Sequence, residues 1–306
     1  MSRWFNTAGP CQPEIHYMLP SIERLPSVAR LVSQQCCFVI HAPRQTGKTT
    51  AMLTLAQQLT AQGKYAALMV SVEVGAAYPQ SPEKAEVAIL RAWLDAATFW
   101  LPLELHPSDW SDCASIGQAL KRWSEECLRP IVLFIDEIDA LQDDALISVL
   151  RQLRDGYPRR PTGFPQSLAL VGLRDVRDYK VAAGGSQRLG TASPFNIKVE
   201  SLTLRNFTLA EVASLYGQHT ADTGQAFTPE AVQLAFDLTQ GQPWLVNALA
   251  RQMVEQIVLD PSISLTSDHV EAAKEILIQR QDTHLDSLAE RLREPRVRAI
   301  IRLNRK

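Results

Sequence analysis

The sequence predicts an α/β fold with a parallel sheet, followed by an α-helical domain. In the first two thirds of the 306-residue chain, short and almost continuous apolar runs alternate with longer stretches of good helix formers. Strands that are buried on both faces of a parallel sheet have this appearance. From about Leu204 the pattern is helical only. We therefore expect an α/β domain over residues 1–204 and a helical lid domain over residues 205–285.

Apolar runs of strand length define the expected sheet, and they cover residues 36–40, 65–72, 131–135 and 167–173, with residues 195–199 completing it. Helices are expected between these runs, over residues 82–101, 115–128 and 143–154. A Pro-rich lead-in, residues 1–35, should be irregular until a short helix over residues 28–35.

Capping signals place the helices of the second domain. Thr208 precedes a helix with Glu211 three residues later, which is a capping box. Thr228 precedes Pro229 at the start of another helix. Gly241-Gln242-Pro243 separates this helix from a third, over residues 244–258, and Ser267-Asp268 is expected to cap a fourth. Residues 286–306 are expected to form a C-terminal helix whose last part, residues 295–306, is either poorly ordered or docked on a partner surface.

Composition limits the possible classes of function. The formal net charge is −2, and acidic and basic residues are interspersed, so a broad electrostatic grip on nucleic acid is not expected. The five cysteines show no C-x-x-C spacing, which argues against zinc and disulfides. No apolar run has the length of a membrane span, and no secretory leader is visible. We expect a cytoplasmic protein without a membrane segment.

A phosphate-binding pattern follows the first expected strand. Ala42-x-x-x-x-Gly47-Lys48-Thr49 stands between that strand and a run of helix formers, which is the strand, loop and helix context that the pattern requires. Backbone N–H groups and the start of the helix would then face an anion. Lys48 would reach the β- and γ-phosphates, and Thr49 would hold Mg²⁺. The expected nucleotide-binding residues are Ala42, Pro43, Arg44, Gln45, Thr46, Gly47, Lys48, Thr49 and Thr50.

A second motif supplies carboxylates at the end of a buried strand. Residues 131–135 are apolar and lead into Asp136 and Glu137, and parallel sheets bind ligands at this edge. Asp136 would orient Mg²⁺, and Glu137 would position or polarise the attacking water. Arg174 follows the next strand, where it could sense a γ-phosphate or form an ordinary surface ion pair.

Residues of the lead-in are candidates for contact with adenine. His16 and Tyr17 stand before the first strand, in a segment that often covers the base side of a nucleotide site. The alternative is that they anchor the segment to the domain. No spacing rule decides between these two interpretations.

With these motifs placed, the chain resembles the AAA-like ATPases of the STAND and origin-recognition branch of the P-loop NTPases, whose sheets are of the ASCE type. The resemblance rests on the phosphate loop, on Asp136-Glu137, on Arg174 in the sensor 1 position and on Gly241-Gln242-Pro243. The lead-in resembles that of bacterial AAA-like domain proteins. The resemblance implies ATP and Mg²⁺ as ligands, and it implies that Pro243 lies against the nucleotide.

The leading expectation is a Mg²⁺-dependent ATPase that acts as a nucleotide-controlled conformational switch on a protein partner or through self-association. An ATP-dependent loader or remodeller on DNA is the alternative. A helicase is excluded because two RecA-like domains do not fit in the chain. An arginine finger is not assigned, although Arg154, Arg159 and Arg160 lie in a plausible region, so hydrolysis is expected to be slow. Arg251 is not expected to act as a lid sensor.

Overall fold

The computed structural model describes residues 3–173 and 197–280, and the described residues form two compact units. Residues 20–173 and 197–205 form the first, here called the α/β unit, and residues 3–19 and 206–280 form the second, here called the helical unit. Arg174 and the expected C-terminal helix over residues 286–306 lie outside the described residues. The chain passes between the units at Leu19–Pro20 and at Arg205–Asn206.

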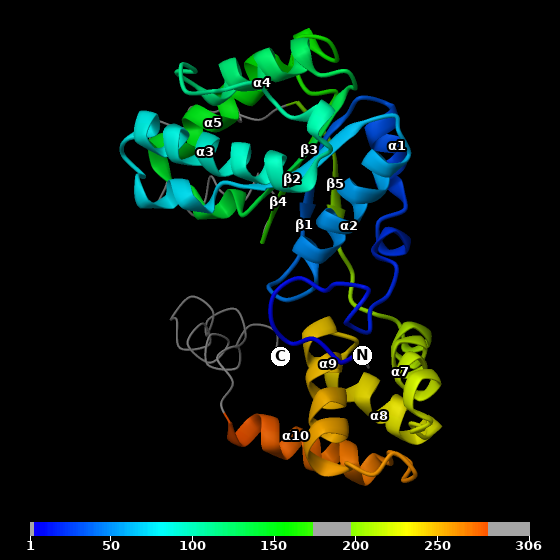
Figure 1. Cartoon of the computed structure of the whole chain (residues 1–306). Helices are drawn as coiled ribbons and strands as arrows, with labels where there is room; N and C mark the ends of the chain where they lie inside the picture. The colour runs from blue at the N-terminus through cyan, green and yellow to red at the C-terminus, as the bar shows by residue number, and fades with distance from the viewer. Residues whose placement is uncertain (1–2, 174–196, 281–306) are drawn as a thin grey trace. The chain divides into compact units, whose positions relative to one another are not determined.

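A parallel sheet is the centre of the α/β unit (Figure 1). Within the described residues it contains β1 Cys37–His41, β2 Ala66–Ser71, β3 Ile131–Asp136, β4 Ser167–Gly172 and β5 Lys198–Thr203. The strand order is β2-β3-β4-β1-β5, and every pair is parallel. The carboxyl ends of all these strands therefore meet at one edge of the sheet, which is where open α/β sheets bind ligands. The last strand begins later than the expected residue 195.

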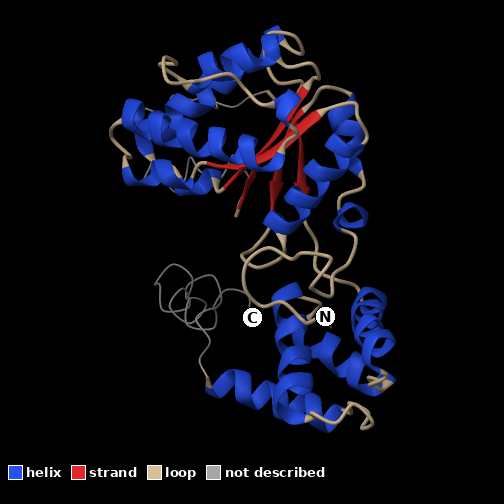
Figure 2. Ribbon diagram, in the orientation of Figure 1, coloured by secondary structure: helices blue, strands red, loops and turns tan. Residues whose placement is uncertain are grey.

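Helices cover both faces of this sheet (Figure 2). They are α1 Ser27–Ser33, α2 Lys48–Ala61, α3 Pro82–Trp100, α4 Ile116–Glu126 and α5 Asp143–Gly156. Alternate residues of β1 point to opposite faces. Phe38 and Ile40 pack in the cluster with α1 and α2, whereas Val39 packs in the cluster with α3, α4 and α5. Burial on both faces explains why the strands are nearly continuous apolar runs.

The helical unit contains α7 Leu209–Thr223, α8 Pro229–Thr239, α9 Pro243–Gln252 and α10 Ser267–Gln279. The capping box of Thr208 and Glu211 is present, and the hydroxyl of Thr228 accepts from the Ala231 N–H. Two expectations were wrong in detail. The third helix passes into a π-helical turn at Met253–Ile257, and Thr266, the residue before Ser267, is the N-cap of α10.

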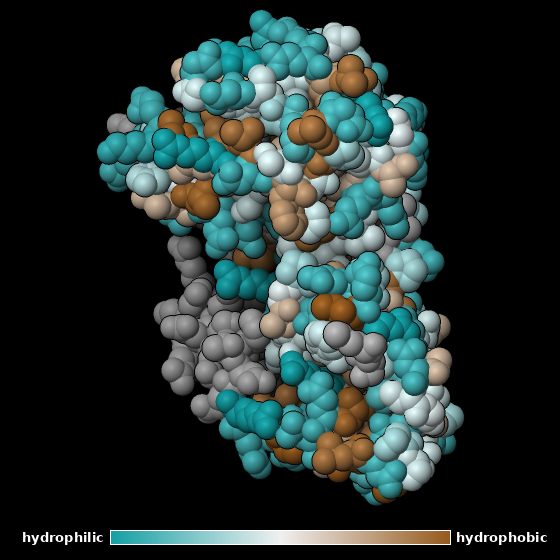
Figure 3. Space-filling model, in the orientation of Figure 1, coloured by the Kyte–Doolittle hydropathy of each residue, from teal (hydrophilic) through white to brown (hydrophobic). Residues whose placement is uncertain are grey.

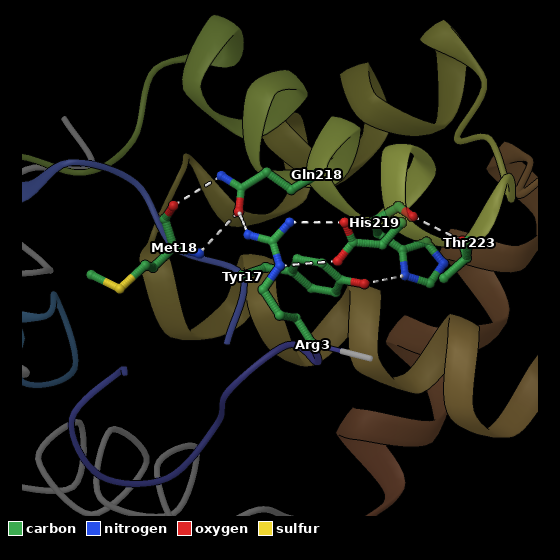
Figure 4. A network of polar contacts seen from close by, with 7 residues as sticks. Arg3, Tyr17, Met18, Gln218, His219 and Thr223 are labelled. Atoms are coloured by element: carbon green, nitrogen blue, oxygen red, sulfur yellow. Dashed lines mark hydrogen bonds and ion pairs between the residues drawn. The ribbon is translucent and has the colours of Figure 1, made fainter. Parts of the chain in front are cut away.

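Residues 3–19 pack in the helical unit, although we expected the whole lead-in to belong with the sheet. Phe5 is fully buried and Tyr17 is 1% exposed, and both lie in the hydrophobic core of the helical unit. The Arg3 guanidinium binds both carboxylate oxygens of Asp222 at 2.9 Å. The Gln218 side chain donates to the Met18 carbonyl at 2.9 Å, beside these contacts (Figure 4). Long-range contacts of this kind leave no local pattern in the sequence.

The surface is mainly hydrophilic on the face that Figure 3 shows, where apolar residues appear as separate groups among polar ones. Exposed large apolar side chains include Phe99, Leu103 and Leu259. Among residues 3–173 and 197–280, none of the helices has both the length and the apolar character that crossing a membrane requires.

Candidate phosphate-binding site

The loop between β1 and α2 has the backbone form that an anion site needs. Gly47, the N-cap of α2, has φ +83°, a left-handed conformation that glycine adopts without steric cost. Gln45 is also left-handed, with φ +62°. Left-handed residues next to right-handed ones turn successive N–H groups toward a common point. The loop therefore presents backbone donors at the amino end of a 14-residue helix, where the helix dipole favours a negative charge.

The Lys48 side chain lies against its own loop. Its Nζ donates to the carbonyl oxygens of Ala42 and Pro43, both at 2.9 Å, and the residue is 9% exposed. Burial lowers the pKa of Lys48, while Asp136, Glu137 and Asp139 oppose this shift. The ammonium group is thus held by two neutral carbonyls, which are weaker partners for a cation than a phosphate oxygen.

Thr49 and Asp136 bring two oxygen ligands together from separate motifs. The Thr49 hydroxyl donates to Asp136 Oδ2 at 2.9 Å, and Asp136 Oδ1 accepts from the Glu137 N–H at 2.9 Å. Asp136 ends β3 and is 3% exposed, and burial raises the pKa of its carboxyl group. A hydroxyl and a carboxylate are oxygen ligands of the kind that Mg²⁺ prefers. The two residues therefore have the chemistry to hold a magnesium ion, and the expected magnesium site stays a prediction.

Glu137 occupies a constrained position after β3. Its φ is +57° and its ψ is +33°, which is the left-handed region and is uncommon for a residue with a side chain. Burial, followed by the nearby charges of Asp136 and Asp139, raises the pKa of Glu137. The Asp139 carboxylate accepts from the Leu173 N–H at 3.1 Å and so connects the acidic turn to the residue that follows β4. Backbone strain and a raised carboxyl pKa together are typical of functional sites.

The residues of the phosphate loop differ in exposure. Ala42 and Thr46 are each 1% exposed, and the Thr46 hydroxyl donates to the Pro43 carbonyl at 3.0 Å. Pro43 and Arg44 are exposed. The remaining residues of the loop and of the first helical turn are partly buried: Gln45, Gly47, Thr49 and Thr50. The buried residues pack inside the loop, and the exposed residues lie at its surface.

Arg24 supports the phosphate loop from behind, through a backbone contact that the sequence did not predict. It ends a 3-10 helix, Ser21–Arg24, and it is 7% exposed. Its Nη2 donates to the Thr46 carbonyl at 2.9 Å, and its Nε donates to the Arg205 carbonyl at 3.1 Å. Both acceptors are backbone carbonyls, which every residue type provides. For this reason no motif could have indicated the contact.

Two expected ligand-binding residues belong to the helical unit. Pro243 is buried at the first position of α9, directly after Gly241 and Gln242. The Tyr17 hydroxyl lies 3.3 Å from His219 Nδ1 (Figure 4), and the ring packs against Phe5. Burial of this ring disagrees with the expected adenine contact, because a base cannot stack on it without displacing its neighbours. The position of Tyr17 favours an anchoring role, although the anchor joins the lead-in to the helical unit and not to the sheet.

Two of the three arginines considered as finger candidates, Arg159 and Arg160, have local partners. Arg159 pairs with Asp155 at 2.7 Å. The Arg160 guanidinium lies 3.6 Å from the centre of the Tyr157 ring and donates to the carbonyls of Gln35 and Gln166. Gln166 precedes β4, so Arg160 lies at the amino end of this strand, at the opposite edge of the sheet from the phosphate loop. These contacts favour a structural role for Arg160.

Comparisons with known proteins concern the family and the fold. Residues 30–179 match the sequence model of a family described as AAA domain. The Walker-type ATPase PABY2304 of Pyrococcus abyssi superposes with a TM-score of 0.60 at 11% identity, over 95% of this chain and 80% of that protein. The ORC2 protein of Aeropyrum pernix gives 0.52 at 16% identity, over 83% of this chain and 64% of that one.

A point mutant of the RuvB protein of Thermotoga maritima gives a TM-score of 0.50 at 14% identity, over 84% of this chain and 68% of that protein. A comparison with curated proteins found no match. At these identities the structural likeness concerns the fold alone. Residues 30–179 therefore resemble an AAA domain, and the parallel sheet and the phosphate-loop pattern are consistent with that match.

Proposed function

We propose that this chain is an ATP-binding, Mg²⁺-dependent ATPase that acts as a nucleotide-controlled conformational switch of the STAND and origin-recognition branch. The observation that carries the proposal is the arrangement of Lys48 and the Thr49–Asp136 pair around the anion-binding start of α2. These residues supply what a nucleoside triphosphate requires: backbone donors, a cation and a pair of oxygen ligands for Mg²⁺.

Each residue has a defined role in the proposed reaction. Lys48 leaves the carbonyls of Ala42 and Pro43 and places its charge on the β- and γ-phosphates. Thr49 and Asp136 would hold Mg²⁺ through their side-chain oxygens, and the ion would supply positive charge to the phosphate oxygens. Glu137 orients the attacking water, and its raised pKa brings the carboxyl group closer to accepting a proton at neutral pH.

The switch part of the proposal concerns Arg174 and Pro243. Arg174 follows β4 in the sequence, and Pro243 is the first residue of α9. Arg174 would sense the γ-phosphate and Pro243 would meet the nucleotide when the helical lid closes. The partner would be a protein or a second copy of the chain. The formal net charge of −2 gives no support to the alternative role on DNA.

Nucleotide titration tests the proposal. Lys48→Ala should weaken the binding of a fluorescent ATP analogue with Mg²⁺ by at least about 10- to 100-fold, because a charge-assisted contact is lost. The fold should persist, because burial lowers the pKa of Lys48 and its charge therefore does not stabilise the nucleotide-free protein. Lys64→Ala is the matched control, since Lys64 is exposed just beyond α2. Equal affinities for both variants and the wild type would overturn the assignment of the phosphate loop.

Glu137→Gln separates binding from hydrolysis. This variant should bind the analogue as tightly as the wild type and release phosphate about 100-fold more slowly, because general-base positioning contributes on this scale. A parallel loss of affinity would show that Glu137 supports the binding of the nucleotide and does not act on water.

A further inference from the structure

The peptide group at which the chain leaves the α/β unit is held by Arg24. The Arg205 carbonyl accepts from Arg24 Nε at 3.1 Å and also from Arg24 Nη2. This carbonyl is part of the peptide group between Arg205 and Asn206, here called the joining peptide. Arg205 is the last residue of the α/β unit. At Asn206 the chain enters the helical unit for the second time. Arg24 itself lies just after the other crossing point, Leu19–Pro20.

The same guanidinium also holds the phosphate loop. Arg24 Nη2 donates to the Thr46 carbonyl at 2.9 Å, and Nη1 would lie 3.7 Å from a Cβ atom placed on Gly47. A planar guanidinium can donate in several fixed directions at once. Arg24 therefore connects the phosphate loop and the joining peptide through one rigid, buried group.

Further contacts continue this connection as far as Lys48. The Pro43 carbonyl accepts from both Lys48 Nζ and the Thr46 hydroxyl, at 2.9 and 3.0 Å. The Thr46 carbonyl then accepts from Arg24. The steps are hydrogen bonds and the covalent bonds of Thr46 itself, so the ammonium group of Lys48 and the joining peptide belong to one network.

After the joining peptide, Asn206 and Phe207 form hydrogen bonds within the helical unit. The Asn206 side chain donates to the Gln240 carbonyl at 3.0 Å, and the Phe207 N–H donates to the Gly241 carbonyl at 2.8 Å. These acceptors belong to the turn that leads into Pro243. A rotation of the peptide between Arg205 and Asn206 would therefore be passed to this turn through the backbone itself.

We propose that Arg24 is a positioning residue that couples the state of the phosphate loop to the linker between the two units. The proposal rests on the proposed function, because it requires that Lys48 exchanges its loop carbonyls for phosphate. When Lys48 does so, the Pro43 carbonyl loses a donor and the peptides between Pro43 and Thr46 reorient. The Thr46 carbonyl is then displaced, and Arg24 shifts the Arg205 peptide with it.

Hydrogen–deuterium exchange on the full chain tests the coupling, with ATPγS and Mg²⁺ as the probe. In the wild type, the probe should change the exchange rates of amides in residues 203–208 by about 5-fold or more, as an allosteric coupling of ordinary strength would. In Arg24→Gln this linker response should fall below about 2-fold while the phosphate loop still responds. Arg30→Gln is the matched control, because Arg30 of α1 pairs with Glu200 of β5 at 2.8 Å in the same unit without contacting the loop.

The comparison is made within each variant, between its free and bound states, so a general loosening of the fold does not imitate the result. Arg24→Lys provides a second variant with the charge retained, and we expect its linker response to lie between those of the wild type and Arg24→Gln.

A full linker response in both Arg24 variants would overturn the coupling. Loss of the loop response as well would show that Arg24 is a binding residue, which also overturns it. Absence of probe binding to the wild type by calorimetry would instead refute the proposed function.

Discussion

Gly241 permits a contact that no other residue allows, and its replacement by alanine should destabilise the helical unit strongly. Its φ is +67°, and a Cβ atom at this position would lie 1.9 Å from the Phe207 carbonyl oxygen and 2.9 Å from its carbon. These obstructing atoms belong to the backbone and cannot turn aside. The Phe207 N–H also donates to the Gly241 carbonyl at 2.8 Å, so the two segments of chain must separate if a methyl group enters.

The cost can be estimated from these contacts. A left-handed conformation costs a residue with a side chain about 1–2 kcal/mol. Forced displacement of a packed neighbour costs about 1–3 kcal/mol, and loss of the hydrogen bond costs about 0.5–1.5 kcal/mol. Together these terms predict that Gly241→Ala lowers the free energy of unfolding of the helical unit by about 2.5–6.5 kcal/mol, and values above about 4 kcal/mol are exceptional for single substitutions.

Two other glycines of the same unit serve as controls. Gly224 is left-handed with φ +80°, but nothing lies within 4 Å of a Cβ atom placed on it, so Gly224→Ala should cost only the conformational term of about 1–2 kcal/mol. Gly217 lies inside α7 with open space around it, so Gly217→Ala should stabilise by about 0.5–1 kcal/mol. Urea unfolding followed by circular dichroism and tryptophan emission measures all three. Equal losses for Gly241→Ala and Gly224→Ala would refute the argument from the Phe207 contact.

Two further predictions concern the packing of residues 3–19 and the charge of Asp136. Phe5→Ala should destabilise the helical unit by about 3–5 kcal/mol, because it empties a fully buried site. The control is Leu259→Ala, at a side chain that is 73% exposed, and it should change stability by less than about 0.5 kcal/mol. Similar losses of stability for both variants in urea unfolding would contradict the placement of residues 3–19. Asp136→Asn should raise the melting temperature of the nucleotide-free protein at pH 7. Burial raises the folded pKa of Asp136 above its unfolded value, so the folded state binds the proton more tightly and stability falls as pH rises between the two pKa values. The gain should therefore disappear below about pH 4, where the carboxyl group is protonated in both states, and a gain that persists in acid would contradict this cause.

Local patterns predicted most of the sheet and most of the candidate site. The apolar runs that became β1, β3 and β4 are buried on both faces, and this burial is what the sequence records. The meeting of Thr49 and Asp136 followed from the rule that parallel strands end at a common edge. The caps at Thr208 and Thr228 were also visible, because the side chain that caps a helix lies next to it in the sequence.

Other features depend on contacts that the sequence does not record. Residues 3–19 are held by side chains about 200 positions away, such as Gln218 and Asp222. Arg24 acts on carbonyl oxygens, which carry no residue identity. The cap of α10 at Thr266 was missed because Ser267 and Asp268 are equally good capping residues, and only the tertiary structure selects among them.

The placement of Phe5 and Tyr17 among α7, α8 and α9 has a consequence for how the chain folds. The α/β unit is a continuous stretch, so a ribosome can release all of it before the last helices are made. The helical unit is discontinuous: its first residues emerge before the α/β unit, and its core lacks its later residues until Leu277 has emerged. Closing such a long loop slows folding. Until then Phe5 has no core to enter, and the nascent chain carries an exposed aromatic segment that a chaperone could bind.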